Sequence, residues 1–268
     1  MTWGEAILLG LLQGFTEFLP VSSSGHLVIF QHVFRISQPG VTFEVLVHFG
    51  TMFSVILVFW KDITALFKGL TNNSEQKKLF LLLLVGTIAT GCVGIIFGSS
   101  IKGLFQNPVV TGIMLLLTGF ITLAISRVSI SPAKNNFSRL TLWDGVFVGL
   151  MQGFAIIPGI SRSGTTILAS LFRGMSRQTA IKFSFLLALP AIAGATALEA
   201  WDFIRAGAGE TPLFSSGYIL AAFLAFLSGV FSIKIFIKLL NKGKFYYFSY
   251  YCWFAGVFTI LYFTFLSH

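Results

Sequence analysis

Charge is the scarcest property of this sequence. Asp, Glu, Lys and Arg make up 10% of its 268 residues, whereas hydrophobic residues make up 55%. The longest polar connections, Lys61–Lys78 and Ser126–Leu140, have the length of linkers, so no separate water-soluble domain is expected. Uncharged apolar runs recur at the length that crosses about 30 Å of hydrocarbon, which predicts an all-α polytopic membrane protein.

Cysteine is also scarce, and basic residues are not concentrated anywhere. The two cysteines, Cys92 and Cys252, lie within apolar runs at unrelated positions, which excludes a disulfide framework or a cysteine metal site. The net charge of +9 comes from Lys and Arg residues that are dispersed along the chain. Because no basic domain collects them, nucleic acid is not an expected partner.

The apolar runs divide into two kinds. Six are long enough to be full transmembrane helices: Val41–Trp60, Leu79–Phe97, Val109–Ile125, Phe183–Ala200, Ser215–Ile233 and Phe245–Leu266. The remaining apolar sequence lies in two similar segments, Gly10–His26 and Gly149–Thr165, which align without a gap at an offset of 139. Eight of their seventeen positions are identical.

Each similar segment contains a short apolar run, a break with proline or glycine, and then serines. Neither run is long enough to cross a membrane, which favours two re-entrant helical hairpins; two ordinary kinked spans are the alternative. The chain is then one integral membrane domain, residues 1–268, with halves at about 1–125 and 140–268. Small residues four apart, such as Gly10 and Gly14, predict close helix packing in each copy.

The distribution of Lys and Arg predicts the orientation. The stretches 61–78, 127–139, 173–182 and 234–244 contain fourteen of the eighteen basic residues. The positive-inside rule puts these stretches in the cytoplasm and both termini outside. The two hairpins then enter from opposite faces as an inverted-topology repeat, an arrangement that commonly forms a binding site near the midplane.

The two breaks contain charges that no loop explains. Arg162 lies in the second break and Glu17 in the first, although a charge at the bilayer centre costs roughly 3 kcal/mol on insertion scales. A structural salt bridge between them is one interpretation. Hydroxyls surround both residues and favour a bound oxyanion instead, because helix N-termini with serines bind phosphate. These hydroxyls belong to Ser22, Ser23, Ser24, Ser161, Ser163, Thr165 and Thr166.

Spacing along the first hairpin predicts two further features. His26 follows Ser23 by three residues, so a nucleophile and a base can share a helix face, although a buried structural histidine has the same spacing. Gln13 and Glu17 lie four apart and could hold a divalent cation beside a phosphate. Glu44 and His48 also share a face, at the outer end of the first full span, where we expect them to line an entrance or pack.

Two motifs closely resemble those of the undecaprenyl-diphosphatases, also called bacitracin-resistance proteins. That family's (E/Q)xxxE motif is matched by Gln13 and Glu17, within QGFTEFLPVSSSGH. Its PGxSRSxxT motif is matched by PGISRSGTT at 158–166. The SFLLALP run at 184–190 extends a resemblance that covers the whole chain. Many relatives have glutamate where this chain has Gln13, which weakens the expectation of a metal ligand there.

The resemblance implies a function and a set of site residues. It implies removal of the terminal phosphate of undecaprenyl diphosphate at the outer face of the bacterial plasma membrane, with a divalent cation such as Mg²⁺ or Ca²⁺. The monophosphate carrier is then reused for peptidoglycan and other polymers. Membrane lipids are the surroundings, and a homodimer is left open. The catalytic set carried over is Glu17, Ser23, His26 and Arg162; the substrate-binding set is Gln13, Ser22, Ser24, Ser161, Ser163, Gly164 and Thr166, with Glu17 and Gln13 as the metal candidates.

Together the residues and the resemblance predict a mechanism and its competitors. Ser23 attacks the terminal phosphorus with His26 as base, and water then releases the phosphate; direct attack by water held by Glu17 or His26 is the competing route. A transporter or flippase of an isoprenoid phosphate or another anion is the main alternative. The type-2 phosphatidic acid phosphatases are excluded because no Arg-Pro pair occurs and Leu168 stands where their histidine would be. A non-catalytic scaffold leaves Arg162 and Glu17 unexplained.

Overall fold

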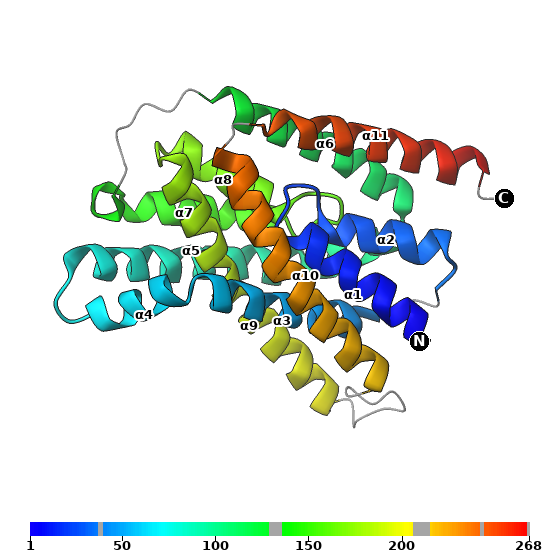
Figure 1. Cartoon of the computed structure of the whole chain (residues 1–268), viewed down its shortest axis with the longest axis horizontal. Coiled ribbons are helices and arrows are strands. Elements are labelled where there is room, and N and C mark those ends of the chain that lie inside the picture. The colour runs from blue at the N-terminus through cyan, green and yellow to red at the C-terminus, as the bar shows by residue number, and fades with distance from the viewer. Residues whose placement is uncertain (37–39, 129–135, 206–214, 242–243, 267–268) are drawn as a thin grey trace.

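The computed structural model describes residues 1–36, 40–128, 136–205, 215–241 and 244–266, and the elements in these ranges are all helices, joined by turns and loops (Figure 1). Two basic residues counted above, Lys134 and Lys242, lie outside these ranges. The helices are α1 (Trp3–Glu17), α2 (Ser23–Val33), α3 (Gly40–Val58), α4 (Trp60–Gly69), α5 (Ser74–Lys102), η1 (Gly103–Gln106), α6 (Pro108–Arg127), η2 (Phe137–Arg139), α7 (Leu142–Phe154), α8 (Arg162–Phe172), α9 (Arg177–Arg205), α10 (Ser216–Asn241), α11 (Tyr246–Leu261) and η3 (Tyr262–Leu266).

Within the described residues, five stretches are long and apolar enough to cross a membrane: Ser74–Gly98, Pro108–Arg127, Arg177–Leu198, Ser216–Leu239 and Tyr246–Leu266. They correspond to five of the six predicted spans. The chain is therefore a multi-pass membrane protein.

The sixth predicted span, Val41–Trp60, has a different form from the one expected. α3 and α4 meet at Phe59 and are bent by 74° relative to each other. The described residues therefore contain six spans if this bent pair is counted as one span, and five if it is not. Lys61 and Asp62 follow directly in α4 and end the apolar run. Asp62 pairs with Lys182 of α9, which holds α4 across the bundle.

The two similar segments fold in the same way locally. α1 and α2 are separated by a short break, as are α7 and α8, and each helix is too short to span. The Glu5 carboxylate accepts the Thr2 backbone N–H at 2.7 Å, and the Asp144 carboxylate accepts the Thr141 N–H at 2.8 Å. Both pairs begin their helices and are 139 residues apart, so the sequence similarity extends to the capping hydrogen bonds.

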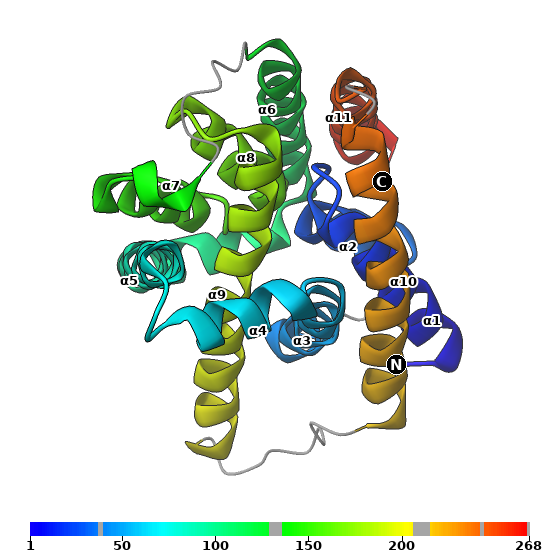
Figure 2. The same cartoon turned by 60° about the vertical axis from the view of Figure 1, so that its left-hand side comes forward.

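Close helix contacts connect each first hairpin helix to a long helix of the other half. A Cβ atom at Gly10 would lie 2.4 Å from the Ala221 carbonyl oxygen of α10, and one at Gly149 would lie 2.1 Å from that of Gly86 of α5. Only glycine permits these approaches, which confirms the predicted use of small residues for close packing. α6 and α11 run side by side along one edge of the molecule (Figure 2).

The two ends of the helical bundle differ in what they contain. The α4–α5 turn, the end of α6 and the start of α7 lie on the left of Figure 1, whereas both chain termini lie on the right.

A buried aromatic cluster that includes Phe18, Phe183, Phe185 and Phe236 packs between the hairpins and the long helices. The hydrophobic core to which it belongs includes Phe18 of the first break and Ile167 of α8.

Candidate active site

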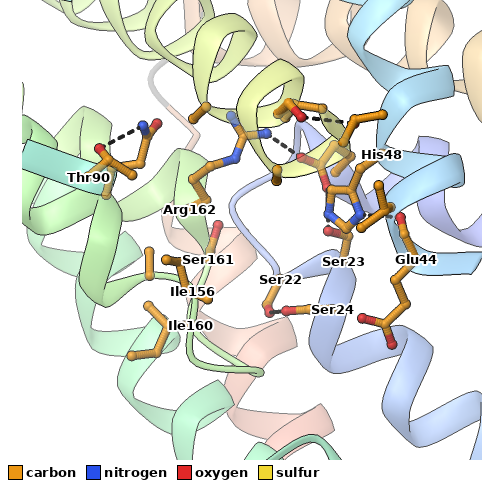
Figure 3. Close-up of a pocket in the computed structure, with 18 of the residues that line it drawn as sticks. Ser22, Ser23, Ser24, Glu44, His48, Thr90, Ile156, Ile160, Ser161 and Arg162 are labelled. Atoms are coloured by element: carbon orange, nitrogen blue, oxygen red, sulfur yellow. Dashed lines mark hydrogen bonds and ion pairs between the residues drawn. The ribbon is translucent and has the colours of Figure 1, made fainter. Parts of the chain in front are cut away.

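A cavity of about 1060 Å³, its open side included, lies where the two breaks meet (Figure 3). The first break contributes Glu17 and the serines 22–24, and the second contributes residues from Ala155 to Arg162. α3 and α9 supply further walls. The structure therefore brings the two similar segments, which are distant in sequence, to one chamber.

The chamber contains an ion pair between the two breaks. Arg162 Nη2 contacts Glu17 Oε1, and the Glu17 side chain is 3% exposed. Arg162 is the first residue of α8, and Glu17 is the last residue of α1. Two charges in a membrane protein interior are tolerated when they pair or face a polar cavity, and these two do both.

The second oxygen of Glu17 accepts three further contacts. Ser23 Oγ donates to Oε2 at 2.5 Å and Gln13 Nε2 donates at 2.9 Å, while His48 Nε2 lies 3.3 Å away. Ser23 is the first residue of α2 and lines the chamber, so its hydroxyl faces both a carboxylate and open space. A serine hydroxyl that donates to a carboxylate has the geometry of a nucleophile beside a base.

His48 and Glu44 of α3 both line the chamber, as one of the two expectations from their spacing had it, and His48 also contacts Glu17. The His48 Nδ1 donates to the Glu44 backbone carbonyl at 2.7 Å, and its Nε2 faces the Glu17 carboxylate. The Glu17 carboxylate can only accept, so the contact is an ion pair when both ring nitrogens of His48 carry a hydrogen. The helical spacing of Glu44 and His48 was the available signal, but spacing alone could not show that Glu17 would be the partner.

His26 does not have the position expected of a base for Ser23. Its Nδ1 donates to the backbone carbonyl of Ser22 at 2.7 Å, and its Nε2 accepts from the Tyr251 hydroxyl at 2.6 Å. The ring is thus occupied on both nitrogens, is 3% exposed, and is absent from the chamber lining. Sharing a helix face with Ser23 was not sufficient, because the ring turns back toward its own preceding turn.

The predicted hydroxyls separate into two groups. Ser22, Ser24 and Ser161 line the chamber, and Ser22 and Ser161 cap α2 and α8 by accepting the N–H of Gly25 and Gly164 at 3.2 and 3.1 Å. Both helices therefore begin at the chamber, where their N-termini favour an anion.

The second group lies behind the chamber wall. Ser163 Oγ donates to the Leu19 carbonyl at 3.2 Å, and the hydroxyls of Thr166 and Ser184 lie 2.5 Å apart. Neither Ser163, Gly164 nor Thr166 is among the lining residues. They connect the second break to its surroundings.

The Gln13–Glu17 pair does not fit a divalent cation in this arrangement. Arg162, Ser23, Gln13 and His48 already contact the two Glu17 oxygens, and a cation there would adjoin a guanidinium. The Gln13 amide donates its N–H to Glu17, while its buried carbonyl oxygen has no hydrogen-bond partner among the residues that the structure describes. Within the described residues, no three His, Cys, Asp or Glu side chains are grouped as metal ligands.

Apolar side chains form one wall of the chamber. Its lining includes Val45, Phe105, Ile156, Ile160, Ile192 and Ala195. Gln152 and Thr90 add a polar contact at 3.1 Å between their side chains. The chamber thus combines a charged, hydroxyl-rich part with an apolar wall, which suits a ligand with an anionic head and a hydrocarbon chain.

Fold and site together define a class: a polytopic helical membrane protein with an amphipathic chamber where Arg162 and the N-termini of α2 and α8 meet. The particular family follows from comparison of sequences. The chain belongs to the family described as bacitracin resistance protein BacA, whose family model it matches over residues 6–258.

Similar proteins span nearly the whole chain. It is 43% identical to an undecaprenyl-diphosphatase of Alkaliphilus metalliredigens, over 98% of this chain and 99% of the relative. Proteins of the same name from Desulforapulum autotrophicum and Halothermothrix orenii are 40% and 41% identical, with 96% of this chain covered and 97% and 96% of the relatives.

Proposed function

We propose that this chain is an enzyme that hydrolyses undecaprenyl diphosphate to undecaprenyl phosphate and inorganic phosphate, returning the lipid carrier for use in peptidoglycan and other polymers. The family membership and the names of its relatives support this substrate. The observation that carries the proposal is the placement of Ser23 and Arg162 around Glu17 in a chamber with an apolar wall.

The diphosphate head would bind at the polar part of the chamber. The N-termini of α2 and α8 and the Arg162 guanidinium supply positive potential and N–H donors, and Ser22, Ser24 and Ser161 supply hydroxyls. Substrate phosphate would compete with Glu17 for Arg162. The first isoprene units would lie against Ile156, Ile160 and the other apolar lining residues.

Ser23 is the proposed nucleophile. Glu17 Oε2 accepts the hydroxyl proton as the Ser23 oxygen forms a bond to the terminal phosphorus, and the bond from that phosphorus to the bridging oxygen breaks. Undecaprenyl phosphate leaves, and water then hydrolyses the phosphoserine to release inorganic phosphate. Arg162 and the His48 imidazolium stabilise the charge on the transferring group.

Direct attack by water is the competing route, with Glu17 as its base. It requires no covalent intermediate and leaves Ser23 as a hydrogen-bonding residue. Mg²⁺ or Ca²⁺ stays a prediction of the family resemblance, and the steps above are assigned to the chain's own side chains. Gln13, Ser163, Gly164 and Thr166 are proposed to support the two breaks instead of contacting phosphate, given their hydrogen-bond partners.

We also propose a topology for the chain. The halves 1–125 and 140–268 form an inverted-topology repeat in which α1–α2 and α7–α8 are re-entrant hairpins, as supported by their equivalent caps and glycine contacts. The helix ends and loops that are rich in Lys and Arg lie on the cytoplasmic side of a bacterial plasma membrane. Both chain termini and the chamber opening lie on its outer side. Labelling of Arg35→Cys but not Lys68→Cys by an impermeant external reagent supports this orientation; the reverse overturns it.

Purified protein in detergent tests the enzyme against the transporter. Release of inorganic phosphate from undecaprenyl diphosphate is expected although no second compartment exists, whereas a transporter would release none. Phosphate transferred from substrate labelled at the terminal phosphorus should be trapped on wild type but not on Ser23→Ala. Most of the turnover remaining in Ser23→Ala would overturn the covalent route and leave the water route.

A further inference from the structure

We propose that Tyr251 is a positioning residue for this reaction: through His26 it holds the Ser22 backbone in the conformation that directs the Ser23 hydroxyl at Glu17. The inference rests on the proposed function and adds to it a residue outside the chamber. It also assigns His26 a role in positioning instead of proton transfer.

A continuous chain of hydrogen bonds connects α11 to the first break. The Tyr251 hydroxyl and His26 Nε2 are 2.6 Å apart, and the two rings are stacked with an interplanar angle of 7°. On the opposite side of the imidazole, Nδ1 is 2.7 Å from the Ser22 carbonyl oxygen. The carbonyl can only accept, so Nδ1 carries the hydrogen and Nε2 of the neutral ring accepts from the phenol.

The residue held by this chain has an unusual backbone. Ser22 has φ 68° and ψ 97°, a region that residues with a side chain rarely adopt. Such conformations persist when their surroundings specify them, and they are concentrated at functional sites. The Ser22 carbonyl accepts both the His26 backbone N–H at 3.2 Å and the imidazole N–H.

Ser23 follows directly, so any rotation of the Ser22 peptide moves the proposed nucleophile. Its hydroxyl is 2.5 Å from Glu17 Oε2. Small displacements of reacting groups have large effects on rate. The hydrogen bonds from α11 therefore affect the position of the Ser23 hydroxyl and the rate of the reaction, although Tyr251 does not line the chamber.

A second contact from α11 reaches the same break. Cys252 is fully buried beside Tyr251, and its Sγ lies 3.7 Å from the Pro20 carbonyl oxygen. The other break has a corresponding support from α6: Thr118 Oγ1 donates to the Gly159 carbonyl at 2.7 Å and accepts the Ser161 N–H at 3.0 Å. Each break is thus held by one of the paired helices α6 and α11.

The test compares Tyr251→Phe with Tyr250→Phe. Tyr250 is the neighbouring residue, exposed at 59%, and its ring packs on Tyr246 and Trp253. For Tyr251→Phe we expect kcat for phosphate release to fall about tenfold, the effect of about one hydrogen bond, with KM unchanged. Tyr250→Phe should equal wild type. An unchanged kcat in Tyr251→Phe, or a change confined to KM, overturns the inference.

His26 variants separate positioning from proton transfer. Asparagine can donate from nearly the place of Nδ1 but cannot act as a base, so His26→Asn should retain much more activity than His26→Ala. Equal loss in both variants overturns the positioning role. Tyr251→Phe should add little to His26→Ala, because both changes interrupt one chain; additive effects contradict the inference.

Hydrogen exchange provides a readout that does not need turnover. Backbone amides of residues 22–26 should exchange faster in Tyr251→Phe than in wild type and Tyr250→Phe, with the corresponding residues 161–165 unaffected. Inactive wild type would contradict the proposed function alone. Unchanged exchange at residues 22–26 would overturn the positioning inference alone.

Discussion

The two hairpins have one local architecture and different chemical content. Equivalent serines, Ser22 and Ser161, cap their second helices, yet the next residue is Ser23 in one hairpin and Arg162 in the other. Glu17 of the first corresponds to the apolar Ile156 of the second. Neither hairpin therefore contains the proposed site alone: one supplies the nucleophile and carboxylate, the other the guanidinium.

The backbones of the two breaks differ at the serine that caps the second helix of each hairpin. Ser22 has a positive φ of 68°, whereas its equivalent Ser161 has −76°. The second break has its positive φ, 94°, at Gly159, where no side chain opposes it. Within the two breaks, Ser22 is thus the only residue other than glycine with a positive φ, and it lies directly before the proposed nucleophile Ser23.

The largest expected effect separates two arginines of the second hairpin. Arg162 pairs with Glu17 in the chamber, and Arg173 Nε lies 2.5 Å from Asp144 Oδ1 at the other end of α8. Arg162→Lys should lower kcat/KM for phosphate release about 100-fold, since lysine cannot reproduce the planar donors of arginine. Arg173→Lys should stay near wild type. Similar losses in both variants would show that α8 needs its ion pairs only for folding.

A smaller effect is expected for two histidines near the first hairpin. His48 contacts Glu17, whereas His32 Nδ1 donates to the Val28 carbonyl at 2.8 Å on α2. His48→Gln removes the imidazolium charge from the chamber and should lower kcat about tenfold. His32→Gln is the matched control and should retain wild-type turnover. Full activity in purified His48→Gln would remove His48 from the proposed mechanism.

The last prediction concerns stability, where no effect on the chemical step is expected. Gly159→Ala places a Cβ at a positive φ and 2.4 Å from the Thr111 carbonyl oxygen, so it should destabilise the fold by about 1–3 kcal/mol. Gly91→Ala, in α5, should be neutral or slightly stabilising, because no described atom outside its own helix turn lies within 4 Å of the added Cβ. Thermal unfolding midpoints in detergent measure both. A midpoint unchanged by Gly159→Ala would contradict the backbone difference between the breaks.

Several site residues were predictable because they break a local pattern. Glu17 and Arg162 are charges in apolar surroundings, and the structure pairs them, as one interpretation of the sequence had it. The sequence did not predict that His48 would contact Glu17 or that His26 would contact Tyr251. Helical spacing places residues on a face, but it does not show which way a ring turns or what lies opposite.

Membrane insertion, the two interrupted helix pairs and their serine caps follow from the amino-acid order, because they depend on apolar run length and on hydrogen bonds within a few residues. The bend at Phe59 and the partners of the buried polar groups depend on packing. Ser23 meets Glu17 across a break, and His26 meets Tyr251 across 225 positions of chain. The first contact depends on how one hairpin folds at its break, and the second depends on α11 of one half packing near α2 of the other, so neither follows from helical spacing in the sequence.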